Sequence, residues 1–368
     1  MTIDQPTPDP TVDELLVESV TRLFAEVCSF DAVQTAEADG WAPEVWRAVA
    51  DAGFAWIGIP EEAGGSGGTI ADACAVLRAA GAHAAPIPLA ETGLLGGWAL
   101  ARAGLPLPDG PVTVVPGRPD DTLAATEHRD GTVELRGTAH RVPWAAQVER
   151  IVVVAPSVTT TAHHVLLVPP AAVTITPATN LAGEPRPTVS FDDYVVPASD
   201  AALAPAPVTV SSLRLRGALT RASLMAGALE AMSRLTVGYT DQRVQFGRPV
   251  GRFQAVQQHL VWGAQDAALA LMAAEVAARE ATRIADGLAR FEIAAARTVA
   301  DEAALTATRW AHQAHGAMGM TQEYALHHLS RRLWAWRGEY SGPAEWATEV
   351  GRLAGGLGAD GLYPLIAS

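Results

Sequence analysis

The chain has 368 residues and a net charge of −14, and 49% of its residues are apolar while 18% are charged. This length allows two or three domains, and the apolar content provides a sizeable core, which excludes global disorder. The acidic balance argues against nucleic-acid binding. Lysine is absent, so a Walker-type phosphate loop is excluded as well.

Two cysteines, Cys28 and Cys74, are too few for a disulfide framework or a zinc knuckle, and they favour a reducing, cytoplasmic location. The first residues are acidic and proline-rich, and we expect a disordered lead-in over 1–10. They carry no signal-peptide pattern. No uninterrupted run of about 20 apolar residues predicts a membrane span.

Apolar periodicity predicts an N-terminal helical domain over 11–108. Its helices are expected at about 11–27, 41–52, 70–81 and 89–104, with Thr69 capping the third. The glycine-rich loop at 64–68 is not a dinucleotide fingerprint, because its glycine spacing is wrong and no βαβ unit surrounds it.

Short β-branched runs between Gly, Pro and Asp turns predict a middle antiparallel β domain over 109–205. His163 and His164 lie between two of these runs. They have no third ligand at a convincing spacing, so we predict no metal site.

Residues 206–368 return to helical periodicity and predict a four-helix bundle. The first helix begins near 213, and the others cover about 252–285, 289–314 and 323–336. The overall expectation is an α+β chain with two helical regions flanking the β domain.

The stretch YTDQRVQFGRPVGRFQAVQ at 239–257 crosses a break between the first two of these helices. Arg243, Gln245 and Phe246 therefore lie at a helix end, where a cation, an amide and an aromatic ring can face a planar, phosphorylated ligand. The alternative is a helical hairpin whose polar residues are only solvated.

This arrangement resembles the acyl-CoA dehydrogenase family. IPEEAGGSGG at 59–68 resembles the glycine loop of that family's first domain, and FDDYVVP at 191–197 resembles the end of its β domain. AHQAHGAMGMTQEYALHHLSRRLW at 311–334 resembles its C-terminal flavin-contact segment. The resemblance implies FAD as cofactor, α,β-dehydrogenation of an acyl-CoA thioester, and an electron-transfer flavoprotein as acceptor.

The resemblance also assigns cofactor-binding residues. Arg243 matches the arginine that binds the flavin pyrophosphate, and Phe246 matches a cofactor contact, with Gln245 beside them. Gln313, Gly316 and Ala317 match a second flavin-contact segment, in which alanine replaces one glycine. In the family these residues reach across a dimer interface to the flavin of the neighbouring subunit.

The catalytic base implied by the resemblance is Glu339, although it matches the family position only after a one-residue shift. The alternative is a solvated carboxylate. Some members carry the base on the first helix of the bundle, where this chain has Gly217. The base must be a desolvated carboxylate beside the thioester.

The β domain departs most from the family pattern. LAATEHRDG at 123–131 replaces a loop that normally faces the flavin, and Val142-Pro143-Trp144 replaces a hydroxyl-bearing strand. Proline offers the flavin neither a hydroxyl nor an N–H. Trp144 then either packs on the ring or fills the core.

Two oligomeric hypotheses follow. In the first, the chain belongs to an α2β2 hetero-oligomer and completes the flavin site of a related subunit, acting on a bulky or steroid-derived acyl-CoA. In the second, it forms a homo-oligomer with a variant flavin site. A flavin monooxygenase or nitroalkane-oxidase-like enzyme and a purely structural subunit are the other classes. A serine hydrolase is disfavoured because no G-x-S-x-G elbow occurs.

Overall fold

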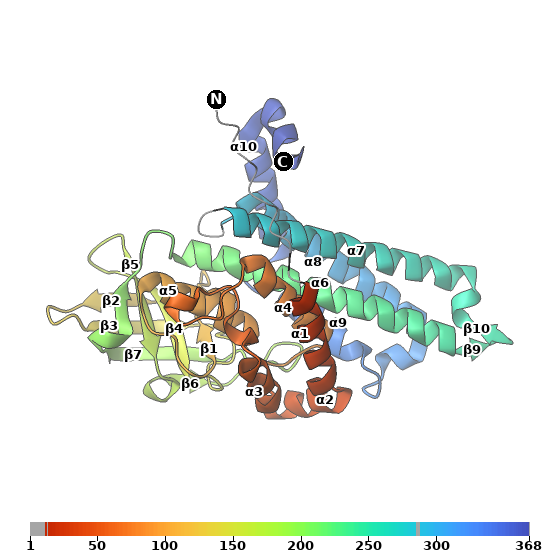
Figure 1. Cartoon of the computed structure of the whole chain (residues 1–368), viewed down its shortest axis with the longest axis horizontal. Helices are drawn as coiled ribbons and strands as arrows, with labels where there is room; N and C mark the ends of the chain where they lie inside the picture. The colour runs from red at the N-terminus through yellow and green to blue at the C-terminus, as the bar shows by residue number, and fades with distance from the viewer. Residues whose placement is uncertain (1–11, 13, 285–287, 368) are drawn as a thin grey trace.

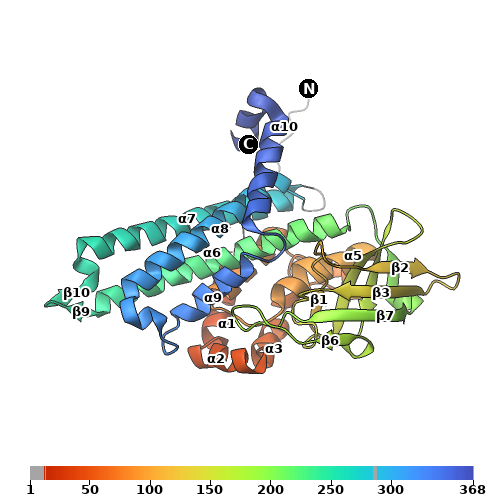
Figure 2. The same ribbon diagram turned by 180° about the vertical axis from the view of Figure 1, so that it is seen from behind.

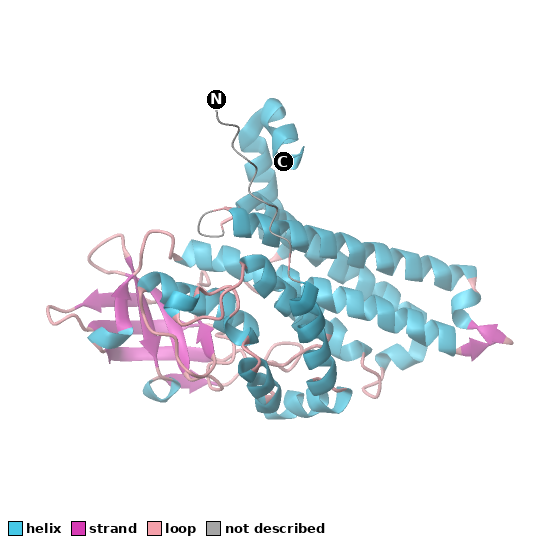
Figure 3. Cartoon of the chain, viewed as in Figure 1, coloured by secondary structure: helices cyan, strands magenta, loops and turns pink. Residues whose placement is uncertain are grey.

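The computed structural model describes residues 12, 14–284 and 288–367, so the predicted lead-in at 1–10 lies outside the described residues. An N-terminal helical region, a β domain of two sheets and a long helical bundle follow one another along the chain (Figures 1 and 3). The predicted α+β architecture is confirmed. The proposed divisions near 108 and 205 fall in the loops after α5 and after β8.

The N-terminal region contains one helix that periodicity did not predict, α2, whose N-terminus is capped by Ser29. Thr69 caps α4 as expected, in a reciprocal capping box with Asp72. The predicted helix at 89–104 divides into a π-helical segment, η3, and a short α-helix, α5. The elements are α1 (Glu14–Val27), α2 (Phe30–Asp39), α3 (Pro43–Asp51), η1 (Phe54–Trp56), η2 (Glu61–Ala63), α4 (Ile70–Ala82), η3 (Glu91–Gly97) and α5 (Trp98–Ala103).

The β domain has two four-stranded sheets, with strand orders β1-β4-β5-β8 and β2-β3-β7-β6. The described strand pairs are antiparallel except β1–β4, which is parallel and corrects the wholly antiparallel prediction. A parallel pair needs a long crossover connection. The connection from β1 to β4 contains the β2–β3 hairpin, which belongs to the other sheet. The strands are β1 (Val112–Val114), β2 (Ala124–Glu127), β3 (Val133–Ala139), β4 (Arg150–Pro156), β5 (His163–Val168), β6 (Thr174–Thr176), β7 (Thr188–Val196) and β8 (Ala201–Leu203), with short helices η4 (Pro170–Ala172) and η5 (Ala198–Asp200).

The C-terminal region contains the four predicted long helices and a fifth, α10. The sequence did not predict α10 because its many glycines disfavour a helix. Figures 1 and 2 show α10 projecting from the bundle, and it is kinked at Gly358, whose φ is 67°. The same views place the small β9–β10 hairpin at the bundle end farthest from the sheets. The elements are α6 (Val210–Gln242), β9 (Val244–Gln245), β10 (Arg248–Pro249), η6 (Val250–Arg252), α7 (Gln254–Arg283), α8 (Arg290–His315), η8 (Gly316–Met320), α9 (Leu326–Trp336) and α10 (Pro343–Ala367).

Among the described residues, α7 is the one helix that is long and apolar enough, by length and composition, to cross a membrane. Only 22% of its most apolar window is buried. Because α7 packs along α6 and α8, we interpret it as a bundle helix with one exposed apolar face.

A buried network of charges joins the three regions where they meet. Four carboxylates and four guanidiniums alternate through it, so the charges balance, and distances between paired atoms run from 2.5 to 3.4 Å. Burying unpaired charges costs several kcal/mol per ion, so such a network is tolerated only when fully paired. In order, its members are Glu91, Arg221, Glu339, Arg186, Glu184, Arg332, Glu37 and Arg331.

Glu37 provides a test of this network. Burial alone would raise the pKa of Glu37, but a hydrogen bond from His328 and the charges of Arg332 and Arg331 lower it to about 2. Its folded pKa lies below the ordinary value of 4.5, so its stabilisation is complete above pH 4.5 and is lost as the pH falls towards 2. We expect Glu37→Gln to lower the unfolding free energy at pH 7 by about 3 kcal/mol, since removing one partner strands buried charge.

Urea titrations at pH 7, 5 and 3 measure the effect, and the difference between variant and wild type should shrink at pH 3. Glu44→Gln is the matched control, because Glu44 forms an exposed pair with Arg47 worth well under ~1 kcal/mol. Equal losses in the two variants would contradict a stabilising network.

Candidate functional site

The β9–β10 hairpin presents three of the predicted cofactor residues to solvent. Phe246 and Gly247 form its two-residue turn with φ of 52° and 78°, the left-handed pair that tight hairpins require. Phe246 is 91% exposed, and its ring contacts only the edge of Phe253 among the described aromatic rings. Arg243 and Gln245 are also exposed. An aromatic ring this exposed at a hairpin tip is available for contact with another molecule.

The second predicted segment lies at the same end of the bundle. Tyr239, one turn before the hairpin, stacks on His315 at the end of α8, with ring centroids 4.5 Å apart. Gln313, Gly316 and Ala317 flank His315 and are exposed. Gly316 has a φ of 60° and a ψ of −137°, a conformation open essentially to glycine. The structure therefore brings these six predicted residues to one exposed surface.

Glu339 is elsewhere and is buried. It follows α9 and pairs with Arg186 and Arg221, at 2.7 Å to each of its two carboxylate oxygens. Asn180 donates a further hydrogen bond to it. The solvated alternative is excluded, since the side chain is 8% exposed. Burial would raise the pKa of Glu339, but the two guanidiniums outweigh burial and hold it below its ordinary value of 4.5.

The turn that carries Glu339 is fixed by a third buried arginine, Arg297 of α8. One of its terminal nitrogens donates hydrogen bonds to the carbonyls of Trp336 at 2.8 Å and Arg337 at 2.9 Å. A longer contact of 3.3 Å reaches the carbonyl of Glu339. These carbonyls lie at and just beyond the end of α9, where the Glu339 N–H also donates to the Trp336 carbonyl at 3.1 Å, so Arg297 acts as an additional side-chain cap. The carboxylate therefore has little freedom to turn towards a substrate.

The alternative base position at Gly217 is occupied by a neighbouring ring. A Cβ built on Gly217 would lie 2.2 Å from Cδ1 of Tyr340. Tyr340 is buried, and its φ of 52° turns the ring onto α6. No larger side chain fits at 217, so neither family position offers an available carboxylate here.

The departures in the β domain have a structural explanation. Trp144 is 2% exposed and packs in the β-domain core, with the Arg186 guanidinium 5.5 Å from its ring, so it fills the core. LAATEHRDG forms β2 and the start of its turn to β3. The loop beside Glu339 is instead 116–119, directly after β1, which sequence reasoning missed. The Pro116-Gly117 pair at the start of this loop is the sequence signal that could have identified it.

Little space surrounds Glu339. A cavity of about 240 Å³ lies on one side, between loop 116–119 and the turn at 338–342. A smaller cavity of about 20 Å³ lies between Glu91 and Trp336, and it is lined by Arg186 and Arg221, the two partners of Glu339. Pockets for drug-sized ligands occupy roughly 300–1,000 Å³. Both cavities are smaller than that.

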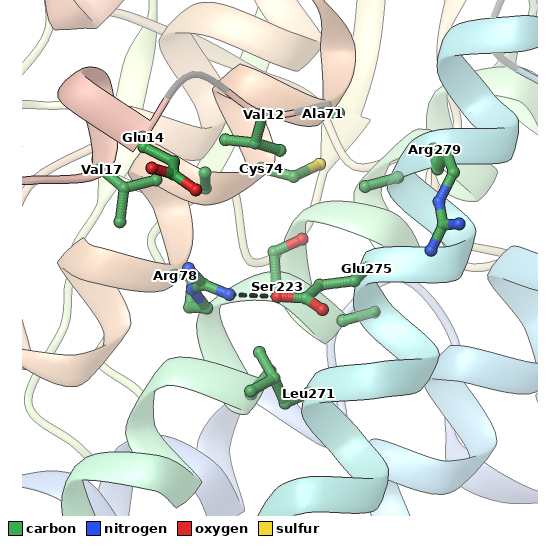
Figure 4. A pocket seen from close by; sticks show the side chains of 14 residues that line it. Val12, Glu14, Val17, Ala71, Cys74, Arg78, Ser223, Leu271, Glu275 and Arg279 are labelled. Atoms are coloured by element: carbon green, nitrogen blue, oxygen red, sulfur yellow. Dashed lines mark hydrogen bonds and ion pairs between the residues drawn. The ribbon is translucent and has the colours of Figure 1, made fainter. Parts of the chain in front are cut away.

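A larger cavity of about 460 Å³ lies apart, between α1, α4, α6 and α7. Figure 4 shows Cys74 and Ser223 on its wall, with the Arg78–Glu275 ion pair across it. Burial raises the pKa of Cys74 to about 11, so its thiol is unreactive at neutral pH. None of the predicted site residues lines this cavity.

One group of side chains has metal-ligand spacing. Potential ligand atoms of Glu37, His327 and His328 lie within 4.8 Å of one another. Glu37 already accepts hydrogen bonds from His328, Arg331 and Arg332. Two guanidiniums beside the carboxylate repel a cation, so the group is better explained as part of the charge network.

Comparisons with known proteins agree with this architecture. Residues 11–106 match the N-terminal domain of acyl-CoA dehydrogenases, and residues 212–349 match the C-terminal domain. Acyl-CoA dehydrogenase FadE27 of Mycobacterium tuberculosis is 30% identical over 311 residues, covering 77% of this chain and 80% of FadE27. Acyl-CoA dehydrogenase IpdE2 of Mycolicibacterium smegmatis is 28% identical over 322 residues, covering 85% of this chain and 89% of IpdE2.

Solved structures share the whole fold. The ChsE4–ChsE5 complex from Mycobacterium tuberculosis superposes with a TM-score of 0.85 at 25% identity, covering 94% of this chain and 99% of that one. The fold alone is shared with a Tcur3481–Tcur3483 steroid acyl-CoA dehydrogenase variant (TM-score 0.79, 23% identity, coverage 93% and 97%). PigA with FAD and proline also shares it (TM-score 0.79, 17% identity, coverage 96% and 99%). This chain therefore belongs to the acyl-CoA dehydrogenase family.

Proposed function

We propose that this chain is a non-catalytic subunit of a flavin-dependent acyl-CoA dehydrogenase and completes the FAD site of a related partner subunit. The observation that carries this proposal is the state of Glu339. Dehydrogenation needs a carboxylate that accepts the α-proton of the thioester, with a pKa near the working pH. Glu339 is held below its ordinary pKa, and arginines occupy both of its oxygens. It is therefore a poor base.

The location of the cofactor residues supports a flavin shared with a neighbouring chain, which the family resemblance implies for homo-oligomers and hetero-oligomers alike. Arg221, which holds Glu339, and Arg243 are 22 residues apart on and just beyond α6, which at 1.5 Å per residue is about 33 Å. The cavity beside Glu339 is too small for FAD. Arg243, with Gln313 on the same surface, is free to meet the pyrophosphate of a flavin bound to another chain.

The exposed face of α7 supports a stable partner. Trp262, Leu269, Met272 and Val276 recur at spacings of seven, three and four residues, which places them on one stripe of the helix. All four are exposed. An apolar stripe of this length marks a protein interface. The ChsE4–ChsE5 structure is a complex of two different chains, which supports a hetero-oligomer here.

The substrate that we propose is a bulky, steroid-derived acyl-CoA, because a protein of the same fold is described as a steroid acyl-CoA dehydrogenase. In the assembly, bound FAD would supply the hydride-accepting chemistry, and Arg243, Phe246 and Gln313 of this chain would hold it. We propose an electron-transfer flavoprotein as the acceptor and the cytoplasm as the location.

The first prediction concerns flavin stoichiometry. The chain purified alone should contain no FAD, and the complex formed by co-expression with its partner should contain one FAD per pair of chains. Visible absorbance against protein concentration measures both values. One FAD per subunit in the chain alone, together with oxidation of an acyl-CoA, would replace the proposal with a homo-oligomeric enzyme.

The second prediction concerns Arg243. In the assembled complex, Arg243→Ala should weaken FAD binding roughly 10- to 100-fold, since charge-assisted hydrogen bonds contribute about 1.5–3 kcal/mol. Arg243→Lys should be intermediate, because an ammonium keeps the charge but loses the bidentate fork. Flavin fluorescence after dilution reports dissociation. Arg47→Ala, at an exposed position on α3, is the control and should leave FAD binding unchanged.

The third prediction separates structure from catalysis at Glu339. Glu339→Gln should destabilise the protein by about 3–5 kcal/mol, because it leaves two buried guanidiniums undercompensated. Turnover by the intact complex should stay within about twofold of wild type. Steady-state assays on gel-filtered complex measure this. A fall of roughly 100- to 10,000-fold in turnover, with the complex intact, would make Glu339 the base after all.

A further inference from the structure

The cavity of about 240 Å³ beside Glu339 has a lining unlike the rest of this acidic chain. Four guanidinium groups line it, against the carboxylates of Glu339 and Glu345. Both carboxylates are already paired with arginines. Arg186 and Arg214 are partners of these carboxylates and Arg118 pairs with Asp120, so the uncompensated positive charge of the lining comes from Arg141. The four arginines are Arg118, Arg141, Arg186 and Arg214.

These arginines differ in how far they are already engaged. Arg186 is 2% exposed and is fixed by Glu184 and Glu339. The Arg118 guanidinium donates a hydrogen bond from Nε to the exposed carboxylate of Asp120. Arg141 is exposed and has no hydrogen bond or ion pair with any residue that the structure describes. Unsatisfied donors around a concave space favour an anionic ligand.

The fourth arginine completes a polar rim. One terminal nitrogen of Arg214 contacts the hydroxyl of Ser341 and lies 3.2 Å from Glu345. Ser341 itself, like Arg141 and Tyr340, has a positive φ, with values of 83°, 56° and 52°. Left-handed conformations of residues other than glycine cost free energy and gather at ligand sites. Three residues that line the cavity thus have a left-handed backbone conformation.

The volume limits the ligand. The cavity is below the range of roughly 300–1,000 Å³ for drug-sized molecules. A phosphate group fits this space, and the guanidinium fork matches its oxygens in pairs. We propose that this cavity binds a phosphate-class dianion, either inorganic phosphate or the phosphomonoester end of a larger molecule. This site goes beyond the proposed function, since it needs neither flavin nor acyl-CoA in this chain.

Calorimetric titration of the purified protein, together with its partner subunit where one copurifies, tests the proposal. Sodium phosphate should bind saturably at one site per chain, whereas sodium chloride at equal ionic strength should not. Arg141→Ala should weaken phosphate binding at least tenfold, and the double variant Arg118→Ala/Arg141→Ala should abolish it. The control is Arg129→Ala, an equally exposed arginine in the β2–β3 turn, which should bind as wild type does.

Absence of saturable phosphate binding, or equal binding by Arg141→Ala and Arg129→Ala, would overturn the site. AMP distinguishes the two ligand sources. Competition between AMP and phosphate supports a phosphomonoester, and phosphate binding without competition supports the free ion. If the chain binds one FAD per chain and this FAD displaces phosphate, both the phosphate site and the proposed function are overturned. If the chain contains no flavin and shows no phosphate binding, the phosphate site is overturned and the proposed function is not.

Discussion

The pairing of Glu339 with Arg186 and Arg221 is the interaction on which the rest of this structure depends. Each partner comes from a different part of the fold: a turn after α9, the β domain, and the first bundle helix. Such a group is tolerated in a dry interior only when every charge is compensated. The wider network supplies that compensation from Glu91 at one end to Glu37 at the other. The relative placement of the three regions is thereby fixed by charge as well as by apolar packing.

This fixation supports the proposal that Glu339 is not the catalytic base. A catalytic carboxylate needs a pKa near the working pH and an open lone pair, and a substrate needs volume. Here arginines occupy both oxygens, Tyr340 packs on Gly217, and the cavity that Glu339 lines has a volume of about 240 Å³. The contacts that stabilise the domain junction are therefore the same contacts that engage both carboxylate oxygens of Glu339.

Sequence reasoning succeeded where the signal is local. Periodicity predicted most helices and the strand-rich middle, and Thr69 was identified as a cap from its position alone. It failed where the partners are distant: Arg221 and Arg186 lie 118 and 153 residues from Glu339. No local sequence pattern distinguishes a glutamate that is ion-paired at both oxygens from a catalytic one. The one-residue shift from the family position was the only sign that Glu339 differs from the family's base. The parallel β1–β4 pair was missed for the same reason, while the glycines of α10 masked a helix.

The two groups of candidate residues obey opposite physical demands. Arg243 and Phe246 extend from a hairpin at the tip of the bundle, where exposure of an aromatic ring is unfavourable unless another molecule covers it. Glu339 is buried where full pairing is required. Within one chain the two groups lie about 33 Å apart along α6, so they are placed to serve two different flavin sites. A neighbouring chain that holds its flavin against the hairpin would cover Phe246 and leave the charge network around Glu339 intact.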